Sequence, residues 1–467
     1  MSRANGYDHR EALFGIPPYG GSIQQNVIYA GVDQNLCSPV QKGEWKSPFI
    51  LLVDRGECTF VQKVRNAQHA GAAAVIIADN ACQCKHEKVC TPEPGKVCEE
   101  REPIMADDGS GYDITIPSVL LFKQDADPIK AVLMHGKTVR MELSWSLPNP
   151  DNHVEWDLWT SPTDYVSSQF KLEFKEAAVA LGTSATFTPH MYIYDGIAAG
   201  CRSDEGFNEC FNLCTNNGRY CAADPDNDLD YGISGADVVT ESIRRLCIWE
   251  EYGDDGIGGP WWDYIRFFSD KCDTSELFMK EDCVNSAMAQ AGVDFNKVQE
   301  CISNHGGLEA DAPNDFLDKQ LTEKETKGIV VMPVIFVNGV AVRGAMEFAT
   351  VFKAICAGFA PNTQPQICTK CSTCSDEKTC VISGKCPASA GTVGQGTFVG
   401  SLAGLTLAFS VLGVVIYMRQ QRLMKEQVRG MIKEYMPLEI QNQNVDTALE
   451  LGDDYDDDDN DAQGTYT

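Results

Sequence analysis

The sequence predicts a multidomain α/β ectodomain, followed by one transmembrane helix and a disordered acidic tail. Three observations predict this arrangement. Short apolar runs alternate with helical patterns before residue 360, residues 398–418 form an uncharged apolar segment, and all 20 cysteines precede that segment. A chain of 467 residues with 43% hydrophobic content can form two or three domains with their own cores.

Residues 11–147 are predicted to form a first α/β domain. FILLVD (49–54) is a buried strand, FVQKVRNAQHAGA is an amphipathic helix, and AAAVIIADN is a second buried strand. Two buried strands joined by a helix are typical of a parallel β-α-β crossover. A polar insertion with cysteines (81–110) separates them from IPSVLLF, a short helix and the alternating strand TVRMELSW.

Residues 151–360 are predicted to form a second domain. FTPHMYIYD is strand-like, a helical middle with cysteines follows, and VVMPVIFVNGVAVRG forms two strands joined at Asn338 and Gly339, a strong hairpin signal. Met332-Pro333 before an apolar strand resembles the cis-proline site of thioredoxin-like folds, so Pro333 is expected to be cis. The helical middle is similar to the insertion of DsbA-like proteins.

Residues 361–390 form a cysteine-rich juxtamembrane stub. Cys368, Cys371 and Cys374 have spacings that suit zinc, but no histidine completes the set. Because the cysteines all precede the apolar segment, an oxidising compartment and disulfides are favoured. The stub holds five cysteines, so one is expected to pair outside it, with Cys356 as the candidate.

The apolar segment 398–418 has the length of about 20 residues that a helix needs to cross a bilayer. Basic residues cluster after it, from Arg419 to Lys433, which predicts a type I orientation with a cytosolic tail (419–467). Gly400 and Gly404 form a G-x-x-x-G pair that could support a homodimer. The net charge of −29 disfavours nucleic acid as a partner.

The first 20 residues lack the apolar core of a signal peptide, although the cysteines and the span require the secretory route. A start further upstream is the preferred explanation, and a span that acts as its own signal anchor is the alternative.

VDRGECTFVQKVRNAQHAGAAAVIIADN and IPSVLLF resemble a protease-associated domain, and NPDNHVEWDLWTSPTD narrows the likeness to plant and algal vacuolar sorting receptors. The resemblance implies a cargo-binding loop at Arg55, Gly56, Glu57 and Cys58. A disulfide between Cys58 and Cys37 would fix this loop, although the six cysteines of the domain allow 15 connectivities. The epidermal-growth-factor-like repeats usual in the family are absent from the stub, which puts calcium dependence in doubt.

A thioredoxin-like oxidoreductase needs C-x-x-C after the first strand of its sheet. The sequence places that strand at MYIYD, where the next cysteine is Cys201, without a partner at that spacing. Redox catalysis is therefore not expected.

The segment ADPDNDLDYGISGAD offers a candidate calcium site. Asp226, Asp228 and Asp230 alternate, and Asp237 lies at the twelfth position of an EF-hand-like loop, but Tyr231 replaces the usual glycine. A solvated acidic loop is the alternative.

The tail contains Tyr435, Met436, Pro437 and Leu438, a Tyr-x-x-Leu signal. An extended peptide of this kind can add to a sheet edge while its tyrosine and leucine fill separate pockets of a clathrin adaptor medium subunit. The surrounding VRGMIKEYMPL is similar to the tail of the receptor family.

These features predict a single-pass cargo receptor that binds sorting peptides of soluble vacuolar hydrolases. The resemblance places it in the Golgi, the trans-Golgi network, the prevacuolar compartment and clathrin-coated vesicles. A membrane-anchored disulfide-handling enzyme and a protease-accessory protein are the alternatives, but hydrolase motifs are missing. A ubiquitin ligase would need a RING, and the tail has no cysteine to bind its zinc.

Overall fold

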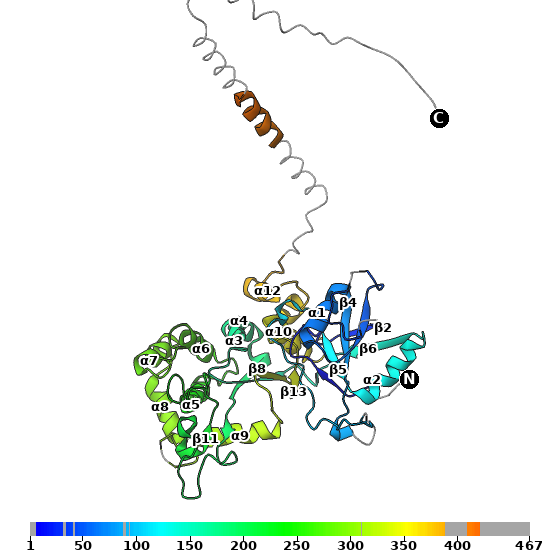
Figure 1. Ribbon diagram of the computed structural model, residues 1–467. Helices are drawn as coiled ribbons and strands as arrows, with labels where there is room; N and C mark the ends of the chain where they lie inside the picture. The colour runs from blue at the N-terminus through cyan, green and yellow to red at the C-terminus, as the bar shows by residue number, and fades with distance from the viewer. Residues whose placement is uncertain are drawn as a thin grey trace, which may run out of the picture. The chain divides into compact units, whose positions relative to one another are not determined.

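The computed structural model describes residues 6–30, 34–40, 43–86, 90–92, 94–309, 311–387 and 409–420. The chain divides into two compact units, Met1–Pro387 and Ala388–Thr467. The first unit holds both predicted α/β domains and the stub (Figure 1).

The first domain is built on a six-stranded sheet with the order β1-β5-β4-β3-β2-β6. Strands β2 to β5 run parallel, and β1 and β6 pair antiparallel at the two edges. The strands are β1 (His9–Glu11), β2 (Ser22–Tyr29), β3 (Phe49–Asp54), β4 (Ala72–Ala78), β5 (Ser118–Leu121) and β6 (Val139–Ser144).

Two helices cover the opposite faces of this sheet. Successive strand residues point to opposite faces, so Leu51 packs with Val64 of α1 (Phe60–Ala70), whereas Leu52 packs with Ile129 of α2 (Lys123–Met134). Helix α1 begins where the Thr59 hydroxyl accepts the Gln62 amide N–H. The predicted β-α-β crossover is therefore confirmed.

The polar insertion between β4 and β5 is held by two disulfides, Cys82–Cys90 and Cys84–Cys98. It contains the short helical turns η1 (Cys84–His86) and η2 (Gly111–Asp113). Glu99 pairs through its backbone with Cys82 and Cys84. The insertion therefore folds back against the chain that leaves β4.

The second domain is built on a four-stranded sheet with the order β13-β12-β7-β8. Strand β7 is parallel to β8 and antiparallel to β12, and the predicted hairpin joins β12 to β13. The strands are β7 (Val154–Thr160), β8 (Ala185–Met191), β12 (Val334–Val337) and β13 (Val340–Val342). The Met332–Pro333 peptide bond is cis, as the sequence predicts.

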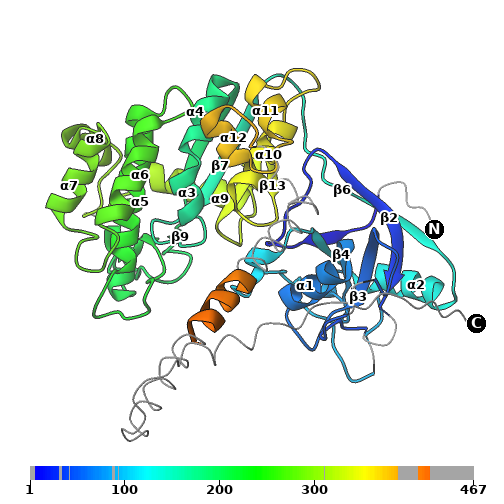
Figure 2. The same ribbon diagram turned by 90° about the horizontal axis from the view of Figure 1, so that it is seen from above.

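Helices α3 (Ser168–Glu173), α4 (Lys175–Leu181) and α10 (Phe348–Ala357) pack on this sheet, around a core that contains Trp156, Phe187 and Trp262. A small sheet follows β8, and helices α5 to α9 then form the insertion; Figure 2 shows α5, α6, α7 and α8 together at one end of the domain. The elements after β8 are β9 (Tyr194–Asp195), η4 (Phe211–Leu213), β10 (Cys214–Thr215), η5 (Asn216–Gly218), β11 (Tyr220–Cys221), α5 (Gly235–Tyr252), α6 (Gly259–Lys271), α7 (Glu281–Gln290), α8 (Phe295–Asn304) and α9 (Asp315–Thr326), whereas the short turn η3 (Gly182–Ser184) joins α4 to β8.

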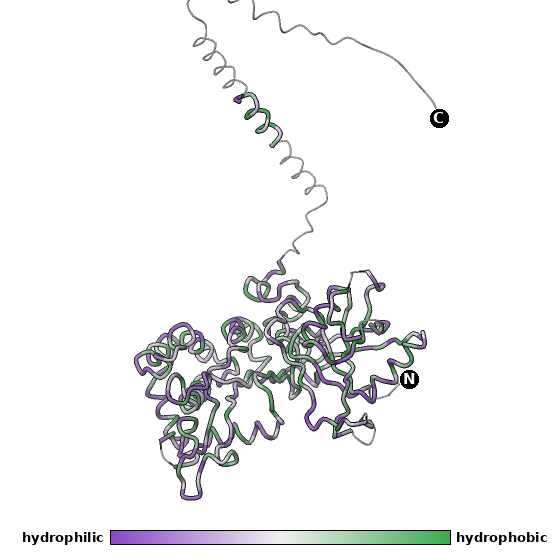
Figure 3. Tube along the Cα trace, in the orientation of Figure 1, coloured by the Kyte–Doolittle hydropathy of each residue, from purple (hydrophilic) through white to green (hydrophobic). Residues whose placement is uncertain are grey.

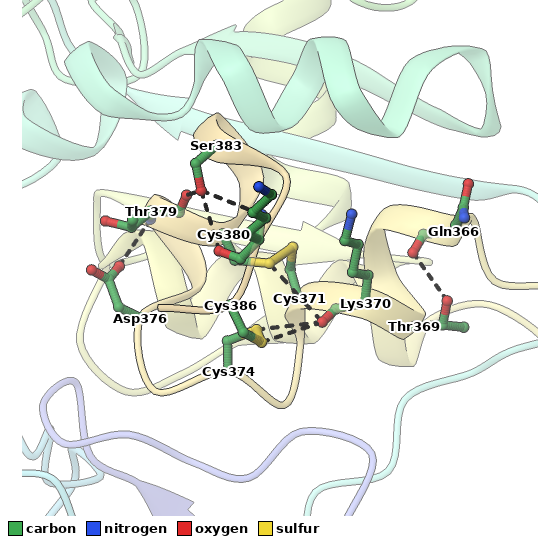
Figure 4. Close-up of a disulfide and its surroundings, with 11 residues drawn as sticks. Gln366, Thr369, Lys370, Cys371, Cys374, Asp376, Thr379, Cys380, Ser383 and Cys386 are labelled. Atoms are coloured by element: carbon green, nitrogen blue, oxygen red, sulfur yellow. Dashed lines mark hydrogen bonds between the residues drawn. A yellow bond between two sulfur atoms is a disulfide. The ribbon is translucent and has the colours of Figure 1, made fainter. Parts of the chain in front are cut away.

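The stub forms two short helices, α11 (Gln366–Cys371) and α12 (Glu377–Ser383). Figure 4 shows the Cys371–Cys380 disulfide that joins them, and Cys374 pairs with Cys386. The fifth cysteine, Cys368, pairs with Cys356, as predicted. Because Cys368, Cys371 and Cys380 also belong to the core of the second domain, the stub packs on that domain.

All 20 cysteines are joined in ten disulfides. Cys201, which the sequence leaves without a partner, is bonded to Cys210. The cysteines of the stub are therefore disulfide-bonded rather than arranged as zinc thiolates.

The structure describes a helix over residues 409–420, which includes the second half of the predicted span, and Figure 3 shows that most of this helix is hydrophobic; residues 398–408 lie outside the described residues. Among the helices of the described residues, none combines the length and hydropathy needed to cross a membrane.

Candidate functional site

The predicted cargo-binding loop follows β3, at the carboxyl edge of the parallel strands. Gly56 has a φ of 118° and Glu57 a φ of 66°, so the backbone turns sharply through the left-handed region. The Arg55 backbone N–H donates to the carbonyl of Ala78, and the Asn80 side chain donates to the carbonyl of Arg55. The loop is thus attached to the chain that leaves the neighbouring strand, β4.

The Arg55 guanidinium joins three separate segments of the domain. Its Nη1 donates to Asp79 Oδ1 and to Glu99 Oε2, both at 2.9 Å. The Asp79 side chain is 0% exposed and the Arg55 side chain 24% exposed, so this ion pair is largely buried. Gln83 donates to the other Asp79 oxygen at 3.0 Å and completes the network.

Burial by itself lowers the pKa of Arg55, but the hydrogen bonds to Asp79 and Glu99 outweigh it and raise the pKa above its usual value. Arg55 therefore stays charged. Its Nε and Nη2 make no hydrogen bond within the described residues, and they remain able to donate to a ligand.

A buried lysine holds the loop through backbone carbonyl groups. Lys63 of α1 is 0% exposed, and its Nζ donates to the carbonyls of Gly56 at 2.6 Å and Asn35 at 2.5 Å. The predicted Cys37–Cys58 disulfide is present and ties the same two segments together. Glu57 is exposed, and its carboxylate has no partner among the described residues. The loop is therefore fixed in its backbone and presents a free carboxylate and part of a guanidinium.

The sequence did not identify Asp79, Gln83, Glu99 or Lys63 as parts of this site. One signal was available for Asp79, because it directly follows β4, the buried strand that neighbours β3 in a parallel sheet, and the carboxyl ends of such strands share one edge. No sequence signal marks Glu99, since it reaches the site through the folding of the insertion.

The cis-proline of the second domain lies beside the end of β7, because Val334 pairs with Trp159. The sequence placed the first strand of this sheet at FTPHMYIYD, whereas the structure begins the sheet with β7. The segment after β7, residues 161–167, contains no cysteine. In this segment Asp164 accepts hydrogen bonds from the hydroxyls of Thr160 and Ser167.

Lys171, next to this segment, is a buried lysine with a strongly lowered pKa, a property that functional residues often have. It is 3% exposed, and burial lowers its pKa to about 7. Its Nζ donates to Thr160 Oγ1 at 3.1 Å and to the Ser161 carbonyl at 3.3 Å. These contacts account for its position without a substrate.

The four aspartates of the candidate calcium site do not converge. Asp226 and Asp228 each accept the backbone N–H of the residue two positions further on. Asp237 caps the amino end of α5 by accepting from Ser234. Among the described residues, the groups that bring three metal-capable side chains together consist of disulfide-bonded cysteines. A calcium site here stays a prediction.

The sorting signal Tyr435–Leu438 and the pair Gly400 and Gly404 lie outside the described residues.

Comparison with known proteins agrees with the two-domain arrangement. The PA domain family matches residues 23–129, and the family described as "Vacuolar sorting receptor thioredoxin-like domain" matches residues 154–356. The chain therefore joins a protease-associated domain to a thioredoxin-like domain of the kind found in sorting receptors.

The curated relatives identify the family. Vacuolar-sorting receptor 4 of Arabidopsis thaliana is 34% identical over 78% of this chain and 58% of its own length, and vacuolar-sorting receptor 1 of Pisum sativum gives the same three values. The chain belongs to the vacuolar sorting receptors. It spans about 58% of the length of these relatives.

Solved structures give only a weak likeness. Oxidised DsbA of Mtb is 13% identical, with a TM-score of 0.24 and coverage of 47% of this chain and 91% of that chain. The relatives are named as sorting receptors rather than as enzymes.

Proposed function

We propose that this protein is a type I membrane cargo receptor that binds sorting peptides of soluble vacuolar hydrolases in the Golgi lumen. The observation that carries the proposal is the loop Arg55–Cys58, which is fixed by the Cys37–Cys58 disulfide and by Lys63 while the Glu57 side chain faces solvent. Because the backbone of this loop is already ordered, the loop loses little conformational entropy when a peptide binds.

The chemistry of the loop suits an extended peptide. Arg55 is positioned through Nη1 alone, so Nε and Nη2 can donate to a carbonyl or a carboxylate of the peptide. Glu57 can accept from a peptide N–H or pair with a basic side chain. The protein's net charge of −29 also favours a basic peptide.

The span 398–418 would connect this lumenal site to the cytosolic tail. There, Tyr435 and Leu438 would bind the medium subunit of a clathrin adaptor as an added strand. The receptor would be packaged at the trans-Golgi network into clathrin-coated vesicles and would release cargo in the more acidic prevacuolar compartment.

Peptide binding is tested by capture on immobilised vacuolar propeptides at pH 7, with the full chain in solution. Native propeptides should retain the chain and scrambled ones should not. The charge-removing variant Glu57→Gln should weaken retention, because Glu57 is exposed and the variant leaves the Arg55–Asp79 network in place. Equal retention by native and scrambled peptides would refute the proposal.

The tail signal is tested with Tyr435→Ala in a fluorescently tagged full chain. The variant should accumulate at the cell surface or in the vacuole, since the tyrosine pocket of the adaptor would stay empty. Gln441→Ala is the control, because it lies in the same tail but outside the four residues of the signal. An unchanged distribution of the Tyr435 variant would count against the signal.

A further inference from the structure

The edge strand β6 of the first domain offers a row of backbone groups to a further strand. It pairs with β2 on one side, and the order of the sheet ends there. Among the described residues, only β2 forms backbone hydrogen bonds with residues 139–144. The Trp145 N–H, directly after β6, donates to the carbonyl of Gly21, before β2. Because residues of an antiparallel strand alternately face the partner and face away from it, the backbone groups of Arg140, Glu142 and Ser144 point away from β2.

A cavity lies beside this open edge. The sheet curves until its two edge strands approach each other, since Trp145 Nε1 donates to Glu11 Oε2 of β1 at 3.1 Å. His9 of β1 and Glu142 of β6 both line a cavity of about 330 Å³ between these edges. Ligand pockets range from about 300 to 1,000 Å³, so this volume suits a few side chains. Most of the other lining residues are apolar: Tyr7, Ile76, Val119, Leu121, Met141, Leu143 and Trp145.

The side chains of β6 alternate between this apolar interior and solvent. Met141 and Leu143 pack with the core on the α2 side of the sheet, whereas Arg140 and Glu142 are exposed. Arg140 donates to the Gln24 side chain at 3.1 Å. The Glu142 carboxylate has no partner in the part of the chain that the structure describes. A strand added beside β6 would follow the same alternation, with apolar side chains towards the cavity and a basic side chain opposite Glu142.

We propose that the open edge of β6 binds an extended protein segment as an added antiparallel strand. In this segment a basic residue opposite Glu142 stands between two apolar residues that enter the cavity. Backbone hydrogen bonds supply the affinity of such a strand, and the alternate side chains supply its specificity. The antiparallel direction is chosen because it is slightly more stable per residue than the parallel one. The site shares no residue with the loop Arg55–Cys58, and the proposal does not rest on the receptor function.

The probe is the peptide acetyl-Thr-Val-Lys-Leu-Thr-amide, measured by isothermal titration calorimetry with the full chain. Its lysine lies opposite Glu142 in the proposed register, so the lysine N–H donates to the Glu142 carbonyl, whereas the leucine N–H faces away from β6. N-methylation of the lysine should weaken binding at least about tenfold, and N-methylation of the leucine should leave it unchanged. Norleucine in place of the lysine should weaken binding about two- to fivefold, because a cross-strand charge pair is lost.

Each of these comparisons can overturn a part of the proposal. Charged side chains can also protect an edge strand from pairing, and no binding of the parent peptide would assign that role to Arg140 and Glu142 and overturn the site. Equal binding of the two methylated peptides would overturn strand addition, and the reverse order of their affinities would overturn the antiparallel register. Equal binding of the norleucine peptide would overturn the pairing with Glu142.

Variants locate the binding to β6. Glu142→Pro should abolish it, because proline removes an N–H that points away from β2, and edge strands tolerate proline at such positions. Glu142→Gln is the matched control: it keeps this N–H, and it should bind the lysine and norleucine peptides equally. Retained binding by Glu142→Pro, with an unchanged melting temperature, would overturn the proposal. The methylated peptides decide the question with the parent chain, so the test does not depend on how well the proline variant folds.

Discussion

Replacement of Arg55 by alanine distinguishes a structural anchor from a surface ion pair. Exposed ion pairs contribute about 0 to 1 kcal/mol, whereas loss of one partner of a buried pair costs about 3 to 5 kcal/mol. Arg55 is 24% exposed, but its partner Asp79 is 0% exposed, so the variant leaves a buried carboxylate without its cation. Asp79 would keep the hydrogen bonds from Gln83 at 3.0 Å and from the Ala81 backbone N–H at 3.3 Å. We therefore expect Arg55→Ala to lower the free energy of unfolding of this domain by about 2 to 3 kcal/mol.

The free energy of unfolding should be measured for the first domain separately, because the chain contains more than one domain. Hydrogen exchange of the β4 amides at increasing urea reports the opening of this sheet. Glu99→Gln is a control of the same network: Glu99 is 38% exposed, so a loss below about 1 kcal/mol is expected. In a double-mutant cycle, Asp79→Asn should recover at least about 1 kcal/mol of the Arg55→Ala loss, because the unpaired charge is gone. A loss below about 1 kcal/mol for Arg55→Ala would refute the reasoning.

Two further predictions concern the second domain. The double variant Cys356→Ser/Cys368→Ser removes a disulfide whose cysteines are 12 residues apart in the sequence. The entropy of the unfolded chain predicts that the free energy of unfolding, measured in urea, falls by about 3 kcal/mol and that the stub is cleaved faster by proteases. A decrease below about 1 kcal/mol would contradict this prediction. Burial lowers the pKa of His190, and the positive charge of Lys327 lowers it further, although the carboxylates of Asp157 and Glu323 act in the opposite direction. The folded state therefore favours the neutral imidazole. The free energy of unfolding is expected to fall as the pH drops from about 6.5, the pKa of histidine in the unfolded chain, through the lower pKa of the folded state. His190→Phe, which can keep the ring stacked on Trp159, should lose less stability between pH 7 and pH 5 than the parent, whereas the exposed-site control His9→Gln should match the parent.

Elements with a local cause were predictable from the sequence. The β-α-β crossover follows from two apolar runs around an amphipathic helix, and the β12–β13 hairpin follows from Asn338 and Gly339. Asn338 has a φ of 48° and Gly339 a φ of 78°, the conformations that these two residue types adopt most readily. The one-sided distribution of cysteines predicted disulfides, and the odd cysteine of the stub predicted the link to Cys356.

Strand β7 was missed because its pattern is not that of a fully apolar central strand. VEWDLWT contains Glu155 and Asp157, which favour loops, although the strand lies between β8 and β12. In the fold Glu155 is exposed, and Asp157 forms an ion pair with Lys327, which is 170 residues further along the chain. A partner so distant cannot be read from the local pattern, so the strand could be assigned only when the sheet was known.

The same limit applied to the candidate site and changes how its mutants should be interpreted. The turn RGEC was predictable as an exposed loop, but the burial of Arg55 depends on Asp79 and on Glu99, which is 44 residues away and placed by two disulfides. Loss of cargo binding in an Arg55 variant would therefore not establish that Arg55 touches the peptide, because the loop itself would be disturbed. Glu57 is free of this ambiguity: its carboxylate has no partner among the described residues, and glutamine keeps its size. A defect in Glu57→Gln with an unchanged exchange rate of the β4 amides would assign the loop to peptide contact, and a defect in Arg55→Ala alone would assign it to support of the fold.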